Sequence, residues 1–234
     1  MHQRKSKKLL FYFFLLIIIS SINNIRLKNL DFQKIEDIEV YGLGEAENKL
    51  LLNKVKNLNL NNIFLINKKK ISNLINSNSL IETYQIFKKY PSAIKIIIKK
   101  TIFLARINYN NKIFIIGSNG KLIPNDLIAD KLPFIFGKPE IQEFLKFKTI
   151  IDQSNFPYEQ IESLYFFPSK RWDIKLKNNV LLKLSNNSTK ASLDYAYSFL
   201  KDYKVGKFTT IDIRITNQII LDEWIFGAWN LFKY

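Results

Sequence analysis

The chain has 234 residues, of which 47% are hydrophobic, so it can form one large or two small domains around a real core. It has no cysteine and its only histidine is His2, which excludes disulfide scaffolds, thiol nucleophiles, cysteine-ligated zinc and sites built on histidine; we expect no catalytic residue, cofactor or metal. The formal net charge is +16, but the lysines are dispersed along the whole chain without a zinc-finger or glycine-rich RNA-binding pattern, so we expect no nucleic-acid partner.

The first 34 residues carry the pattern of a membrane anchor. Residues 9–25 contain 17 positions without a charge, which as a helix span about 26 Å, slightly less than a bilayer core of about 30 Å. The bases that precede this segment, with no acid among them, are Arg4, Lys5, Lys7 and Lys8. The positive-inside rule therefore predicts a cytoplasmic tail at 1–8, a transmembrane helix at 9–25 and a linker at 26–34 that leads to a translocated domain.

A cleaved signal peptide is the alternative interpretation of this segment. Its apolar region would be long, and no Ala-x-Ala-like pair follows, since the nearest small residues, Ser20 and Ser21, have isoleucine three positions before them. We favour an uncleaved anchor. Every later apolar run is interrupted by a charge within about ten residues, which is too short to cross a bilayer. The sequence predicts a single-pass type II membrane protein.

Residues 35–108 alternate between short strands and short helices. The expected strand at 35–43 ends at two glycines, and the expected helices at 45–56 and 68–76 carry apolar residues at helical spacing. Strands are expected at 81–90 and 94–108, joined at Pro91, which cannot donate a hydrogen bond to a ladder. This order predicts two helices on one face of a small sheet, whose other face is wet.

Residues 109–222 are rich in predicted strands. Helices are expected at 141–152 and 189–203, the second capped at its start by Asn187 or Ser188. The expected strands are at 165–168, 171–177, 180–184, 209–215 and 218–221. This region predicts a mixed, mostly antiparallel β domain with covering helices.

Several motifs, taken in order, resemble the FtsQ/DivIB family of cell-division proteins. The first region carries VYG, NIFLI and KKYPSAIKIIIKK, which resemble a POTRA domain. The second carries NYNNKIFIIGSNGKLI, KLPFIFGKP, RWDIKLKNNVLLKL and TIDIRITNQIIL. The resemblance implies an α+β fold with a single transmembrane helix, a POTRA domain of order β-α-α-β-β at 35–108, a C-terminal β domain at 109–222 and an aromatic tail at 223–234.

The closing strand region is the expected partner-binding site. Nothing regular follows it, so its outer edge is open to a strand from another protein. The resemblance implies that the small coiled-coil membrane proteins FtsB and FtsL dock here. Asp212 and Arg214 lie two apart on one face, and for their charges we favour an intramolecular ion pair. The expected contact residues are Asp212, Arg214, Ile215, Thr216, Asn217, Gln218, Ile219, Ile220 and Leu221.

Two further surfaces are candidates for contact. The aromatic tail carries Trp224, Trp229 and Phe232, for which core filling and partner or membrane contact both stay open. The hairpin tip of the POTRA region carries Lys88, Lys89, Tyr90 and Lys95. Lysine keeps the wet face of an edge hairpin soluble. The resemblance adds that this surface recruits other division proteins.

The resemblance therefore implies a non-enzymatic inner-membrane scaffold that links early and late division proteins at the septum through periplasmic contacts. The alternative is an exported POTRA-type binding or assembly module of another envelope pathway. Such proteins can continue into a barrel of many amphipathic strands, for which residues 109–234 are too few and too often interrupted by helix. An enzyme is the third option, and the absence of a paired histidine or cysteine base argues against it.

Overall fold

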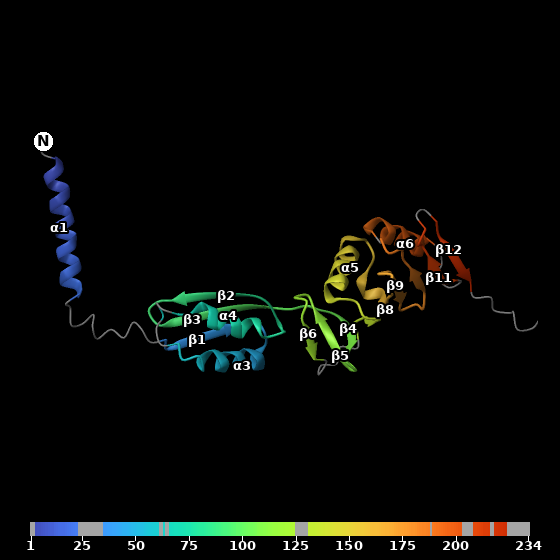
Figure 1. Cartoon of the computed structure of the whole chain (residues 1–234), viewed down its shortest axis with the longest axis horizontal. Helices are drawn as coiled ribbons and strands as arrows, with labels where there is room; N and C mark the ends of the chain where they lie inside the picture. Colours follow the sequence, from blue (N-terminus) through green and yellow to red (C-terminus); the bar gives the residue numbers. More distant parts are fainter. Residues whose placement is uncertain are drawn as a thin grey trace, which may run out of the picture. The chain divides into compact units, whose positions relative to one another are not determined.

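The computed structural model describes residues 3–22, 35–60, 63, 66–124, 131–187, 189–202, 208–215 and 218–223. The chain divides into two compact units (Figure 1). The first unit consists of Met1–Asn78 and Thr83–Lys99, and the second of Ser79–Glu82 and Lys100–Tyr234.

The N-terminal segment forms helix α1 (Gln3–Ile22), whose apolar side chains from Leu9 to Ile19 are exposed. The predicted span at 9–25 runs past the end of this helix into residues outside the described ranges. In the part of the chain that the structure describes, no helix is both long enough and apolar enough to cross a membrane.

The first unit has the predicted order of strand, helix, helix, strand and strand. Its elements are β1 (Asp37–Tyr41), α3 (Glu45–Lys56), α4 (Lys68–Asn76), β2 (Ile81–Lys89) and β3 (Ala93–Lys100). The strands lie in the order β1-β3-β2, with β1 parallel to β3. Ile94, Ile96 and Ile98 are buried on one face of β3, as their alternation with Lys95 and Lys99 predicts, and the helices bury Leu51, Val55, Ile71 and Ile75.

Gly42 directly follows β1, at a position where the neighbouring backbone leaves no room for a side chain. Its φ is 113°, in the region that favours glycine, and a Cβ at this position would lie 1.8 Å from the carbonyl oxygen of Ile98 on β3. The glycine lets the chain turn towards α3 directly beside the neighbouring strand. The glycine of the VYG motif therefore has a steric role.

The expected single strand at 94–108 is wrong, because the chain changes sheets near Thr101. β3 ends at Lys100, and β4 (Phe103–Tyr109) pairs with strands of a second sheet. The buried positions shift from even numbers in β3 to odd numbers in β4, at Ala105 and Ile107. Thr101 is buried, and its backbone N–H donates to the oxygen of Leu80. Residues 101–108 thus lie in the second unit, whereas the sequence predicts them in the first domain.

The second unit is built on one nine-stranded sheet in the order β12-β11-β10-β9-β8-β7-β4-β5-β6. The pairs β10–β11, β7–β8 and β4–β7 are parallel, and the other five are antiparallel, as the mostly antiparallel prediction requires. The strands after β4 are β5 (Lys112–Gly117), β6 (Leu122–Pro124), β7 (Phe134–Phe136), β8 (Ile161–Phe166), β9 (Trp172–Leu176), β10 (Leu181–Lys183), β11 (Phe208–Asp212) and β12 (Ile220–Glu223).

Two helices share the core of this sheet, together with one short 3-10 turn, η1 (Tyr158–Gln160). α5 (Ile141–Gln153) and α6 (Lys190–Asp202) contribute buried side chains to the same cluster as Leu164, Ile174 and Ile211 of the strands. The ring of Trp172 stacks on Phe147 of α5 with their centroids 4.9 Å apart. The α6 cap differs from the prediction, because the Oγ1 of Thr189 accepts from the N–H of Ser192.

Replacing Gly42 by alanine tests the turn at the end of β1. We expect the Gly42→Ala protein to lose about 2 kcal/mol or more of unfolding free energy, because the new methyl group meets backbone at a positive φ. Gly44→Ala is the matched control, since its Cβ would meet only the flexible carboxylate of Glu47. Urea unfolding, followed by hydrogen exchange of the β3 amides, measures both; equal losses would contradict this role for Gly42.

Candidate partner-binding sites

The C-terminal end of the large sheet is formed by β11 and β12, which run antiparallel. In their register Asp212 lies opposite Ile220, Ile211 opposite Leu221 and Thr210 opposite Asp222. β12 is the last strand of the sheet order, so among the described residues it has a strand neighbour on one side only. This end of the sheet is the predicted open edge.

The backbone of β12 has a defined outward side. The N–H of Ile213 donates to the oxygen of Lys183 on β10 at 3.0 Å, so the backbone groups of Asp212 point the other way, towards β12. Ile220 lies opposite Asp212 and therefore directs its own N–H and C=O back to β11. By alternation, the N–H and C=O groups of Leu221 and Glu223 point away from the sheet. These groups are the ones that an added strand would bond.

The side chains of this edge alternate between the core and solvent. Ile219 and Leu221 pack against the hydrophobic core, whereas Ile220 is 52% exposed and Asp222 is also exposed. Ile220 and Asp222 thus stand on the sheet face opposite the core. Two of the expected contact residues, Ile219 and Leu221, thus pack against the core, and Ile220 between them is exposed.

A row of charges crosses the same face next to the edge. Lys183 on β10 lies opposite Asp173 on β9 and opposite Asp212 on β11. Arg214 donates to the Asp212 carboxylate from Nε and Nη2, with Nε 2.9 Å from Oδ1, and Arg171 Nε lies 3.1 Å from Oδ1 of Asp173. Two acids therefore alternate with three bases across three strands. The favoured interpretation of Asp212 and Arg214 as an intramolecular ion pair is confirmed.

The two acids of this row differ in their pKa values. The hydrogen bonds from the Arg214 side chain hold the pKa of Asp212 below its usual value. Burial raises the pKa of Asp173, which is only 3% exposed, although Arg171 and the N–H of Leu184 oppose that effect. Asp212 is thus held as a carboxylate, while Asp173 carries a desolvation cost.

Several predicted contact residues are placed differently or lie outside the description. Ile215 and Gln218 are exposed in the segment between β11 and β12. The residues that lie outside the described ranges are Thr216, Asn217, Trp224, Trp229 and Phe232. The structure therefore brings together Asp212, Arg214 and Ile220 at the sheet end, and the aromatic tail stays a prediction.

The lysines of the first unit lie around the β2–β3 hairpin. Lys89 Nζ is 3.1 Å from a carboxylate oxygen of Glu39 on β1, and Lys95 Nζ lies 5.1 Å from the centre of the Tyr41 ring. Tyr90, in the turn, is exposed, while Lys88 is half-buried. The predicted surface thus spreads over both sides of the hairpin and does not form one cluster.

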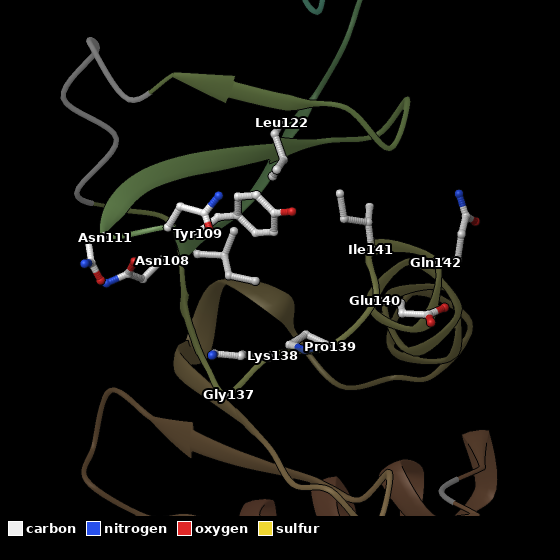
Figure 2. A pocket seen from close by; sticks show the side chains of 12 residues that line it. Asn108, Tyr109, Asn111, Leu122, Gly137, Lys138, Pro139, Glu140, Ile141 and Gln142 are labelled. Atoms are coloured by element: carbon white, nitrogen blue, oxygen red, sulfur yellow. The ribbon is translucent and has the colours of Figure 1, made fainter.

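Sequence reasoning missed a groove of about 890 Å³ in the second unit. It is lined by residues 107–111, Leu122 and 137–142, and Figure 2 shows Tyr109 and Leu122 across it from Ile141. Most of its wall is apolar, with Lys138 and asparagine side chains among the lining residues. These segments lie close together because β4 pairs in parallel with β7, and no local sequence pattern predicts that pairing.

Among the described residues, no group of three His, Cys, Asp or Glu side chains lies close enough together to hold a metal ion. The groove residues also lack a nucleophile with an adjacent base.

The charged row predicts opposite pH responses for its two acids. Because the pKa of Asp212 is lowered on folding, its stabilisation is present above its ordinary pKa of about 4 and is lost as the pH falls through the lower folded value. We expect Asp212→Asn to cost about 1–2 kcal/mol of unfolding free energy at neutral pH, a difference that shrinks in acid.

Asp173→Asn is the matched comparison. The raised pKa of Asp173 makes the native protein gain stability as the pH falls through the folded value, so the free-energy cost of this substitution grows in acid instead. Urea titrations of the native protein and the two variants across the acid range measure both trends. If the two costs moved in the same direction with pH, the assigned environments of Asp212 and Asp173 would be wrong.

Residues 33–100 match the family model of the POTRA domain, FtsQ-type, and residues 105–214 match that of cell division protein FtsQ/DivIB, C-terminal. Cell division protein FtsQ of Rickettsia bellii is 20% identical over 201 residues, and that of Rickettsia prowazekii is 23% identical over 197; each match covers 82% of this chain and 73% of the relative.

A solved structure, the major extracytoplasmic domain of the trans isomer of the cell division protein DivIB from Geobacillus stearothermophilus, aligns with 44% of this chain and 89% of its own. The sequence identity is 11% and the TM-score 0.33. The two family matches follow one another along the chain and meet near the point where β3 ends and β4 begins. The chain belongs to the FtsQ/DivIB family of cell-division proteins.

Proposed function

We propose that this protein is a non-enzymatic scaffold of the division machinery, and that a membrane partner binds it by adding a strand to β12. The partners expected from the sequence, FtsB and FtsL, are the candidates. The observation that carries the proposal is the outward direction of the Leu221 and Glu223 backbone groups at the end of the sheet. An added strand would supply hydrogen bonds to these groups and extend the sheet.

Side chains beside this edge would select the partner. Ile220 offers an exposed apolar side chain, and Asp222 stands two positions later on the same face. A partner strand would place an apolar residue against Ile220, because cross-strand neighbours pack directly. The charges of Asp212 and Arg214 neutralise each other, so their contribution to partner affinity is small.

The N-terminal segment completes the proposal. The uncharged run at 9–25 and the bases before it favour an anchor with the N-terminus in the cytoplasm, so that both units lie in the periplasm at the septum. A scaffold of this kind needs attachment to the membrane in which its partners lie. The exposed hairpin tip at Tyr90 is the proposed contact of the first unit with other division proteins.

Proline at Leu221 tests strand addition. Leu221→Pro removes the outward N–H while leaving the bonds of Ile220 and Asp222 to β11 in place, so we expect partner binding to fall at least tenfold. Leu221→Ala is the matched control, because it loses the same leucine side chain and keeps the N–H. Both proteins are compared by co-purification with FtsB and FtsL, with folding checked by circular dichroism.

The informative result is the difference between these two variants. Loss of binding in Leu221→Pro with binding retained in Leu221→Ala supports the backbone mechanism. Equal binding by two well-folded variants would refute strand addition at this edge. Equal loss in both would move the site to the Leu221 side chain.

Topology is tested by reporters at the C-terminus. Alkaline phosphatase fused after Tyr234 should be active, and a fluorescent protein that folds only in the cytoplasm should be dark, because the bases before residue 9 keep the N-terminus inside. The opposite pattern, or a mature protein that begins near residue 23, would rule out the proposed anchor.

A further inference from the structure

Large apolar side chains of the first unit are exposed on one face of its sheet. Tyr41, Phe87 and Ile97 are 49%, 45% and 40% exposed, although each lies in a strand. Tyr41 and Ile97 are register partners on β1 and β3. This pair therefore stands side by side on the sheet face that α3 and α4 do not cover.

Phe87 belongs to the same face, as the ion pair of Lys89 shows. Lys89 on β2 reaches Glu39 on β1 across the central strand, and Glu39 is the register partner of Lys95. All three side chains therefore project from one side of the sheet. Phe87, two residues before Lys89, projects from it too. One face of the sheet thus combines aromatic and aliphatic side chains from all three strands.

Lysines stand among these apolar groups. Lys95 places its ammonium group 5.1 Å from the centre of the Tyr41 ring, and Lys99 follows two positions after Ile97 on the same face. Lysine stems can cover apolar surface while their charged ends stay in water. Protein segments that lie at the headgroup level of a bilayer typically combine tyrosine and lysine with aliphatic side chains.

The chain before β1 keeps this unit close to a membrane, if α1 is the anchor proposed above. Residues 23–36 connect Ile22 to Asp37, and 14 residues span at most about 50 Å. On this face Glu39 is paired with Lys89, and Lys95 and Lys99 outnumber Asp37, so a net positive charge remains. Within reach of the anchor this charge and an anionic surface attract each other, and the attraction falls off within about a Debye length, roughly 8–10 Å. Contact with the bilayer needs no further partner.

We propose that this face, defined by Tyr41, Phe87, Lys95, Ile97 and Lys99, docks on the surface of an anionic lipid bilayer. The apolar side chains enter the headgroup region, and the lysines contact lipid phosphates. Docking would hold the first unit on the membrane that the proposed anchor enters. The proposal rests on that anchor only for proximity, because the face itself supplies the chemistry of binding.

The absence of cysteine makes a direct test simple. The Ile97→Cys variant carries an environment-sensitive NBD dye on its single thiol, and Leu50→Cys, at an exposed position on α3, is the control. The full chain is reconstituted with vesicles of phosphatidylcholine, or of phosphatidylcholine and phosphatidylglycerol in equal amounts. We expect a blue shift, and quenching by spin-labelled lipid, only at position 97 and only with phosphatidylglycerol.

Charge removal identifies the contact further. Lys95→Gln with Lys99→Gln should weaken the lipid-dependent signal about twenty-fivefold, from roughly fivefold for each lysine near the surface. Lys49→Gln with Lys54→Gln removes the same charge from α3 and should leave the signal unchanged. Circular dichroism verifies that each variant is folded. Equal effects of the two pairs would overturn the docking face.

The outcomes separate this proposal from the anchor. Flotation with neutral vesicles, together with a signal at position 97 that requires phosphatidylglycerol, supports both. Flotation with anionic vesicles only, with the same signal, refutes the anchor and supports the face. Equal signals at positions 97 and 50 overturn the proposed docking of this face on lipid. A spectral shift that follows protein concentration without lipid overturns it too, in favour of contact between copies of the chain.

Discussion

A strand at the end of a sheet leaves every second N–H and C=O pair without a bond to the sheet, and this constraint gives the second unit its proposed binding edge. In β12 the groups are those of Leu221 and Glu223, because Ile220 and Asp222 face β11. The alternation that orients the backbone also sorts the side chains. Leu221 enters the core, and Ile220 stays on the open face. The fold and the proposed binding edge therefore use different groups of one four-residue strand.

The row of paired charges on β9, β10 and β11 stabilises the register of the strands next to β12. Asp173, Lys183 and Asp212 occupy register positions on three neighbouring strands, and Arg171 and Arg214 complete their pairing. Isolated buried charges are costly, so this arrangement makes any slip of β10 or β11 unfavourable. The register of β11 in turn sets which β12 groups face outward. The ion pairs within the sheet thus determine which β12 groups face outward, and they need not touch a partner to do so.

Local patterns predicted what depends on neighbours in sequence. The helices at 45–56 and 68–76 have the expected bounds, because apolar spacing and the residues around their ends decide them. The strand expected at 94–108 is wrong, because the buried positions change from even numbers to odd numbers at Thr101, and the polar positions change from Lys95 and Lys99 to Arg106 and Asn108. That phase shift was visible in the sequence and could have revealed the break.

Contacts between distant segments could not be read from one sequence. The groove beside Tyr109 requires β4 to pair with β7, and the sharing of Lys183 between Asp173 and Asp212 requires three strands in register. The sequence predicts that the regular pattern ends near residue 221, and β12 is the last strand of the described sheet order; the open outer edge stays a prediction. The division of Ile219, Ile220 and Leu221 between core and surface was missed, since a short strand with an isoleucine pair and a leucine shows no polar alternation.

The most direct test of the account is amide hydrogen exchange at β12 in the full chain, alone and bound to FtsB and FtsL. Strand addition predicts that the Leu221 and Glu223 amides become protected on binding, while those of Ile220 and Asp222, already bonded to β11, change little. A complex that forms while the exchange of Leu221 and Glu223 stays as fast as in the free chain would contradict the account.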